Sequence, residues 1–109
     1  MRSATRNKTG RDREYLEFIH SLPCAAAKDF GPWTCYGRIE AHHAGDHGIG
    51  QKADDRTAIP LCRRHHLDGP EAIHNMGKLF WSHHGIDRDE LIQDLNDAYD
   101  RGETNETNF

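Results

Sequence analysis

The stretch Ile59-Pro60-Leu61-Cys62-Arg63-Arg64-His65-His66 decides how this chain is interpreted, because a short apolar run leads directly into a cluster of metal-ligating side chains. The same chemistry surrounds it, since all three cysteines and six of the nine histidines lie between Cys24 and His74. Thiolate sulfur and imidazole nitrogen are the usual ligands of zinc and its first-row neighbours, and a packed interior does not need so many of them. The sequence therefore indicates metal binding first.

The size and composition favour one small domain that a metal helps to stabilise. The chain has 109 residues, 35% of them hydrophobic, and a mean hydropathy of −0.93, so its core is thin. A domain of this size buries only about 60 to 65% of the surface that its unfolded chain exposes. A metal that joins distant segments converts binding free energy into folding free energy. Disulfide bonding is the alternative use of the cysteines, although three of them cannot all pair within one chain.

The distribution of apolar and charged residues bears on where the protein works and on its partners. No run approaches the ~20 apolar residues of a membrane span, and the N-terminus lacks the apolar stretch of a secretory signal, so we expect a soluble, cytoplasmic protein. The net charge of −4 belongs mostly to the C-terminal tail, whereas residues 1–13 carry five basic groups and one acid. This basic arm could contact phosphates, or it could simply be a solvated terminus.

The hydrophobic pattern predicts an α+β fold. It predicts a helix that begins near Arg11 and is stopped by Pro23, strand character from Trp33 to Ala44 with a break at Gly37, and a second short strand at Ala58–Leu61. Further helices are expected from Pro70 to about His84, and from Asp87, whose spacing to Glu90 resembles a capping box, to Gly102. We expect residues 1–10 and 103–109 to form a flexible arm and tail around a single domain of residues 11–102.

The first set of candidate ligands would form a structural zinc site. It consists of Cys24, Cys35, Cys62 and His65. A structural zinc takes four tetrahedral ligands, and two residues between Cys62 and His65 let one turn present two donors to one ion. The ten residues between Cys24 and Cys35 are a wide separation for such a motif. Buried cysteines without a metal are the alternative.

The second set consists of His42, His43, His66 and His74. An uninterrupted helix would separate His66 from His74 by about 12 Å of rise, which is too far for one ion. Gly69-Pro70 must therefore interrupt the segment so that His74 can approach His66. Neighbours on a regular strand point to opposite faces, so the doublet fits one site only at a strand end, where one imidazole binds metal and the other reaches substrate. A histidine pair buried in the core is the alternative.

The combined pattern resembles the HNH (ββα-metal) endonucleases. It comprises Glu40-Ala41-His42-His43, the Gly-rich segment Gly48-Ile49-Gly50-Gln51-Lys52, and Ile59 to His66. Within that family it is most similar to the small phage-type group that includes the RecA-dependent nuclease Ref, and the resemblance covers roughly residues 22–86. It implies an HNH core with a structural zinc and flanking N- and C-terminal helices, in a protein of a bacterial or phage-infected cell.

The resemblance also implies a role for each histidine of the second set. His43 would be the general base that takes a proton from the attacking water, and His42, His66 and His74 would hold the catalytic metal. The products would carry 5′-phosphate and 3′-hydroxyl ends. The family's middle Asn, which orients the base, falls near Thr57, with Asp54 and Asp55 as neighbours.

Ligand chemistry and charge complete these expectations. Three neutral imidazoles suit Mn²⁺, Ni²⁺, Co²⁺ or Zn²⁺ better than Mg²⁺, which prefers oxygen donors. Lys52, Arg63 and Arg64 could hold the phosphate backbone or could be solvated surface charges. DNA is the expected partner, with a recombinase filament or another phage or bacterial DNA-processing protein as a further candidate. The alternative functions are a non-catalytic, zinc-stapled nucleic-acid-binding or adaptor module and a metallohydrolase of small phosphodiesters.

Overall fold

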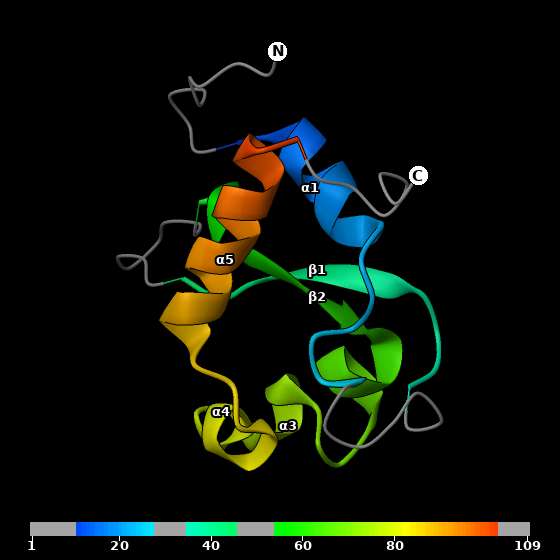
Figure 1. Cartoon of the computed structure of the whole chain (residues 1–109). Coiled ribbons are helices and arrows are strands. Elements are labelled where there is room, and N and C mark those ends of the chain that lie inside the picture. The colour runs from blue at the N-terminus through cyan, green and yellow to red at the C-terminus, as the bar shows by residue number, and fades with distance from the viewer. Residues whose placement is uncertain (1–10, 28–34, 46–53, 103–109) are drawn as a thin grey trace.

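Two short antiparallel strands form the centre of the fold (Figure 1), in a computed structural model that describes residues 11–27, 35–45 and 54–102. Strand β1 (Ile39–His43) pairs with β2 (Ala58–Cys62), and the register places Ile39 opposite Cys62 and His43 opposite Ala58. The helical elements are α1 (Arg13–His20), the 3-10 turn η2 (Asp55–Thr57), the π-helical turn η3 (Arg64–Asp68), α3 (Ile73–Met76), α4 (Leu79–His84) and α5 (Arg88–Asp100). The described part of the chain is therefore a small α+β unit, as the hydrophobic pattern predicts.

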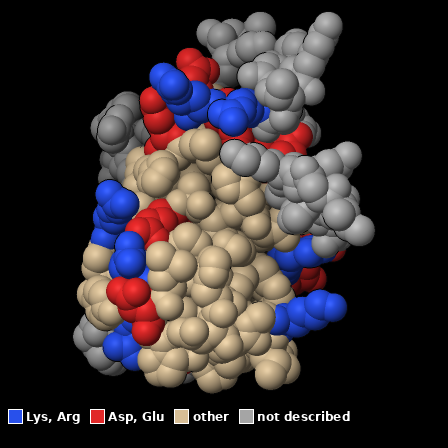
Figure 2. All heavy atoms as spheres, turned by 180° about the vertical axis from the view of Figure 1, so that it is seen from behind, with Lys and Arg blue, Asp and Glu red and all other residues tan. Residues whose placement is uncertain are grey.

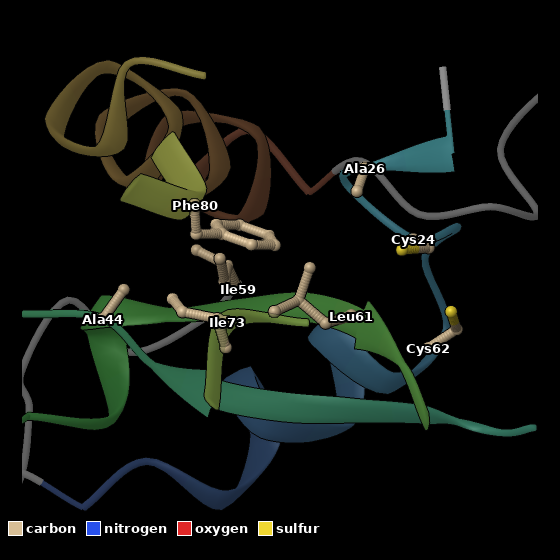
Figure 3. Close-up of a cluster of buried hydrophobic side chains, with 8 residues drawn as sticks. All are labelled: Cys24, Ala26, Ala44, Ile59, Leu61, Cys62, Ile73 and Phe80. Atoms are coloured by element: carbon tan, nitrogen blue, oxygen red, sulfur yellow. The ribbon is translucent and has the colours of Figure 1, made fainter. Parts of the chain in front are cut away.

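The two faces of the sheet pack against different elements. Successive side chains on a strand alternate between faces and directly opposed residues share one, so His42 lies on the same face as Ile59, and His43 on the same face as Ala58. The first face contributes to a buried cluster made of Cys24, Ala26, Ala44, Ile59, Leu61, Cys62, Ile73 and Phe80. Figure 3 shows this cluster running from Ala44 at one end to Cys24 and Cys62 at the other. The second face packs against α1 and α5 through Tyr15, Phe18, Ile19, Ala58 and Tyr99.

The predicted first and third helices are confirmed. Helix α1 begins after Asp12, whose side chain accepts a hydrogen bond from the Tyr15 amide, and it ends before Pro23. Helix α5 begins after Asp87, whose carboxylate accepts a hydrogen bond from the Glu90 amide at 3.0 Å. These side chains satisfy amide groups that the first turn of a helix leaves without a backbone partner. Among the described residues, no helix is long and apolar enough to cross a membrane.

The predicted helix from Pro70 to His84 is wrong, because this segment forms the two short helices α3 and α4. Gly77 separates them with a φ of +58°, a left-handed value that a residue with a Cβ rarely adopts. The strand predicted from Trp33 to Ala44 is also too long, because in the described part of this segment the strand is only β1. The rest of this strand before Cys35, the arm at 1–10 and the tail at 103–109 lie outside the described residues.

A buried arginine joins the elements on the second face. The Arg56 side chain is 8% exposed, and its Nε donates to Asp12 Oδ2 at 2.9 Å. Its Nη1 donates to Asn96 Oδ1 at 3.0 Å and to Asp100 Oδ1 at 3.2 Å. The guanidinium also lies 4.9 Å from the ring centroids of both Tyr15 and Tyr99, where the aromatic faces attract the cation. These five partners and Arg56 are called the Arg56 clamp below, and they hold η2 against α1 and α5.

The Arg56 clamp predicts a large effect of removing the charge. We expect Arg56→Met to lower the free energy of unfolding by about 3 kcal/mol or more, because it leaves the largely buried Asp12 carboxylate without its cation. The control is Arg38→Met, since the Arg38 side chain is 82% exposed and should contribute less than about 1 kcal/mol. Urea denaturation of both variants measures the difference, and equal losses would contradict the role given to the clamp.

Candidate metal centres

Three sulfur atoms surround one imidazole nitrogen at the end of the buried cluster. His65 Nδ1 lies 3.6 Å from Cys24 Sγ, 3.5 Å from Cys35 Sγ and 3.2 Å from Cys62 Sγ. Zinc bonds of about 2.3 Å to sulfur and about 2.1 Å to nitrogen at tetrahedral angles would separate the two atoms by about 3.6 Å. The four donors therefore lie close enough to hold one metal ion such as zinc, and the predicted set is brought together as expected.

The raised pKa values of two of these thiols are consistent with a site in which a bound cation stabilises the thiolate form. Burial raises the pKa of Cys24, and burial together with the neighbouring thiols raises the pKa of Cys35 to about 12. Both thiols are thus neutral near pH 7 when no cation is present. A metal ion favours the thiolate, and binding it releases protons. The Cys62 sulfur also accepts a hydrogen bond from the His65 backbone amide at 3.4 Å. This bond closes the tight turn that the two-residue separation of Cys62 and His65 predicts.

The π-helical turn η3 directs the next residue, His66, to a different cluster. The Gly69 amide donates to the Arg64 carbonyl at 2.8 Å, which closes a turn one residue wider than that of an α-helix. The chain then turns back into α3, and the side-chain amide of Asn75 donates a hydrogen bond to the Gly69 carbonyl at 2.7 Å. His66 and His74 consequently have ring centroids 4.9 Å apart. The predicted interruption of the helix near Gly69 is confirmed.

Three imidazoles converge from β1, η3 and α3. The ring centroid of His42 lies 5.2 Å from that of His66 and 5.9 Å from that of His74. Each of the three rings can offer one nitrogen such that these atoms lie within 4.8 Å of one another. Burial, with the charges of its neighbours, lowers the pKa of His42 to about 4, so its ring is neutral near pH 7. A neutral imidazole is the form that binds a metal, and the three rings therefore fit a second ion.

A carboxylate fixes one of these rings. Glu40 Oε1 lies 2.7 Å from His66 Nδ1, which leaves His66 Nε2 to face the other two imidazoles. The hydrogen bond with His66 is the largest cause of a lowered pKa for Glu40. Such a carboxylate sets the orientation of a ligating histidine and raises its basicity. Sequence reasoning assigned no role to Glu40, although its position two residues before His42 puts both on one face of the strand.

His43 lies apart from the other three imidazoles. It ends β1 on the opposite face, and its Nε2 lies 2.7 Å from Asp55 Oδ1 in η2. The orienting residue was expected near Thr57, but the Thr57 hydroxyl donates to the Asp54 carbonyl at 2.6 Å. Asp55, which is close to that position in the sequence, contacts His43. The sequence offered only three neighbouring candidates and no means of choosing between them.

The arginines expected to bind phosphate already contact carboxylates. Arg63 lies 3.4 Å from Asp68 and 3.5 Å from Glu40, and its side chain is 46% exposed. Arg64 contacts Glu71 at 3.2 Å. Figure 2 shows Lys and Arg interspersed with Asp and Glu at the edges of one face, around a broad area of other residues. The described surface in that view therefore has no continuous basic patch. Lys52 lies outside the described residues.

The Cys and His cluster predicts dependence of folding on metal. We expect about one tightly held zinc per chain, and we expect Cys62→Ala to lose it and unfold. Metal binding in such sites contributes about 10 kcal/mol or more, which is comparable to the whole stability of a small domain. Elemental analysis and circular dichroism measure both effects. The exposed His83→Ala variant is the control, and a folded, metal-free Cys62→Ala protein would argue against a structural metal.

The Glu40 contact predicts a change in affinity at the three imidazoles alone. We expect Glu40→Gln to weaken the binding of Mn²⁺ or Ni²⁺ there by about 10- to 100-fold, because a carboxylate partner strengthens a ligating histidine. Glu71→Gln makes the same chemical change beside Arg64 and should leave this affinity unaltered. Calorimetric titration of the two folded variants compares them. Equal affinities would show that Glu40 does not support the site.

Comparison with known proteins adds a family but no activity. A family model described as "Protein of unknown function (DUF968)" matches residues 2–102. No curated protein and no solved structure matches the chain. That family description names neither a substrate nor a reaction. Because the match covers well over half of the sequence, the chain belongs to the DUF968 family.

Proposed function

We propose that this protein is a metal-dependent endonuclease of the HNH type that hydrolyses phosphodiester bonds of DNA. One observation carries the proposal: three imidazoles converge as a candidate metal site, and the residue after one of them, His43, is hydrogen-bonded to a carboxylate. Metal-assisted hydrolysis of a phosphodiester uses metal ligands together with a general base, and His43 directly follows the candidate ligand His42 at the end of β1. A purely structural histidine cluster would need no such neighbour.

The proposal treats β1, β2 and the segment from η3 to α3 as a ββα-metal core. Its support is the order of the parts, since an antiparallel strand pair is followed by a helical segment and both supply ligands. Helices α1 and α5 would be the flanking helices, and the cluster of Cys24, Cys35, Cys62 and His65 would be the structural zinc that stabilises this core. The likeness to Ref and its phage-type relatives belongs to the same proposal.

The residues would divide the chemistry between them. A divalent cation held by His42, His66 and His74 would stabilise negative charge on the phosphate and on the leaving 3′ oxygen. His43 takes a proton from water, and the hydroxide oxygen forms a bond to phosphorus. The bond from phosphorus to the 3′ oxygen breaks, and that oxygen takes a proton from solvent. The products carry 5′-phosphate and 3′-hydroxyl ends.

Binding of DNA would use side chains around the imidazoles. Arg63 is partly exposed, and its ion pairs at 3.4 and 3.5 Å are long enough to exchange a carboxylate for a phosphate oxygen. Arg64 and Lys52 would extend the contact along the backbone. The basic residues within 1–13 add positive charge at the other end of the chain. A recombinase filament or another DNA-processing protein would be a partner that delivers the substrate.

A zinc-stapled binding or adaptor module is the competing function. The observation that favours it is the pairing of Arg63 and Arg64 with carboxylates, as expected of structural surface charges. Such a module would have no use for His43 as a base. The two functions therefore differ in what happens when this one side chain is removed from a protein that keeps its metal.

The proposed hydrolysis predicts that His43→Ala abolishes cleavage without loss of metal. We expect the rate of nicking of supercoiled plasmid in Mn²⁺ to fall by about 100-fold or more, because a general base contributes about 10²- to 10⁴-fold. The exposed His83→Ala variant should nick at the wild-type rate. Both are compared at equal metal content. Equal nicking by His43→Ala and wild type would exclude this mechanism, and DNA binding without nicking by the wild type would favour the adaptor module.

A further inference from the structure

We infer that an apolar groove beside helix α5 is a docking surface for a partner protein, which supplies a short basic amphipathic helix. The groove has a volume of about 650 Å³. One wall belongs to the stretch that follows α1, from Leu22 to Ala27, and the other belongs to the start of α5 and the residues before it, from Gly85 to Leu95. The inference does not rest on the proposed hydrolysis, because neither His43 nor the three converging imidazoles line the groove.

The walls of the groove are apolar side chains that the fold covers only in part. Leu22, Leu91 and Leu95 are half-buried, and Pro23 is exposed. Leu91 and Leu95 lie one turn apart on α5 and pack against the buried core of the protein. Their remaining surface faces the groove. Apolar surface of this kind, when charged residues surround it, commonly marks a site of interaction.

Three exposed carboxylates form a row along the same groove. Asp87, Glu90 and Asp94 are separated by three and four residues, which places them on one side of the helix. No described lysine or arginine lines the groove, and neither Glu90 nor Asp94 forms an ion pair with a residue that the structure describes. Like charges four residues apart destabilise a helix. A cationic partner would relieve this repulsion.

The charge of this row decides which class of partner fits. Nucleic acids and anionic membranes carry negative charges, which the three carboxylates repel. A small ligand is oriented by polar groups that converge inside its pocket, whereas the carboxylates of this groove are exposed at its edge. A peptide that carries lysine or arginine beside apolar side chains complements both the apolar walls and the acidic row. The groove therefore fits a protein partner.

The dimensions of the row favour a helical segment. Asp87 and Asp94 are seven residues apart, so the row is about 10 Å long. Two turns of a partner helix have the same length, and they present apolar side chains at positions i, i+3 and i+7 on one face. Large apolar residues at these positions would enter the groove, and basic residues beside them would meet Glu90 and Asp94.

The basic arm of a second copy of this chain does not have the composition of such an occupant. Residues 1–10 contain three basic residues but only Met1 and Ala4 as apolar ones. A segment of this composition could pair with the carboxylates but could not fill the apolar part of the groove. The partner is therefore assigned to a different protein.

A fluorescent synthetic helix tests the docking surface on the purified full chain. The peptide carries leucine at i, i+3 and i+7 and lysine on either side of this stripe, and its matched control has glutamate at every lysine position. We expect the lysine peptide to bind at least about 10-fold more tightly than the glutamate peptide, because the acidic row attracts only the first. Equal affinities in fluorescence anisotropy would overturn the inference.

Nitrogen-15 NMR of the wild-type chain shows where the lysine peptide binds. We expect its addition to shift the backbone amide signals of residues 22–27 and 85–95, the two walls of the groove. Shifts confined to another surface would contradict the assignment, even if the affinities differ as expected. Shifts of the same signals by a cationic detergent such as dodecyltrimethylammonium, without binding of the peptide, would identify a small-molecule pocket and overturn the protein partner.

Charge reversal at two positions of α5 supplies matched variants. We expect the double variant Glu90→Lys with Asp94→Lys to bind the lysine peptide about 10-fold or more weakly than the wild type. The control is Asp89→Lys with Asp97→Lys, which makes the same change of net charge on the same helix at positions that do not line the groove. Its affinity should change by less than about threefold. Equal losses in the two double variants would reduce the effect to net charge and overturn the assignment.

Plasmid nicking in Mn²⁺ separates this inference from the proposed function. The two double variants should nick at the same rate, because none of the four altered residues lies among the imidazoles. Selective binding of the lysine peptide in the groove by a protein that does not nick DNA leaves the docking surface in place while the proposed hydrolysis fails. Nicking by a protein that binds both peptides equally gives the opposite result.

Discussion

Two consecutive histidines, His65 and His66, belong to different clusters, and the arrangement of the site depends on this division. His65 faces three sulfurs, whereas His66 faces His42 and His74. Neighbouring residues can diverge in this way because they lie in a widened helical turn that Gly69 closes. The metal ion expected at the sulfurs would thus also fix the start of the turn that carries His66. The two centres share one piece of backbone.

The small apolar content of the chain explains why charged groups take over part of the packing. The described core consists of two modest clusters, one on each face of the sheet. The Cys and His cluster closes one end of the first, and the Arg56 clamp closes the second with a buried cation that lies against two aromatic rings. Specific polar contacts of this kind limit the number of arrangements that a thin core would otherwise allow.

The sequence predicted the parts of the site that depend on ligand type and spacing. The turn that brings Cys62 and His65 together follows from the two residues that separate them. The interruption near Gly69 follows because an unbroken helix would hold His66 and His74 too far apart to bind one ion. The predicted helix from Pro70 to His84 failed because a glycine in the left-handed region at Gly77 divides it. Nothing in the pattern requires that conformation, since isolated glycines also occur inside helices.

The roles of Glu40 and Asp55 depend on pairing across the fold, which spacing alone does not give. Glu40 meets a histidine 26 residues away, and Asp55 meets one 12 residues away. Aspartate and glutamate are common on surfaces, so their presence carried little information. The same holds for Arg63 and Arg64, whose basic character suggested phosphate binding while their partners in the structure are carboxylates. Residue type identified site residues only for cysteine and histidine, which are much less common on protein surfaces than aspartate, glutamate or arginine.

The position of the Arg56 clamp along the chain has a consequence for synthesis. Every ligand of both clusters lies between Cys24 and His74, so a ribosome completes them before it reaches α5. The clamp needs Asn96, Tyr99 and Asp100, which are made near the end of the chain. A nascent chain can therefore acquire metal at both clusters before the second face of the sheet is closed by α5.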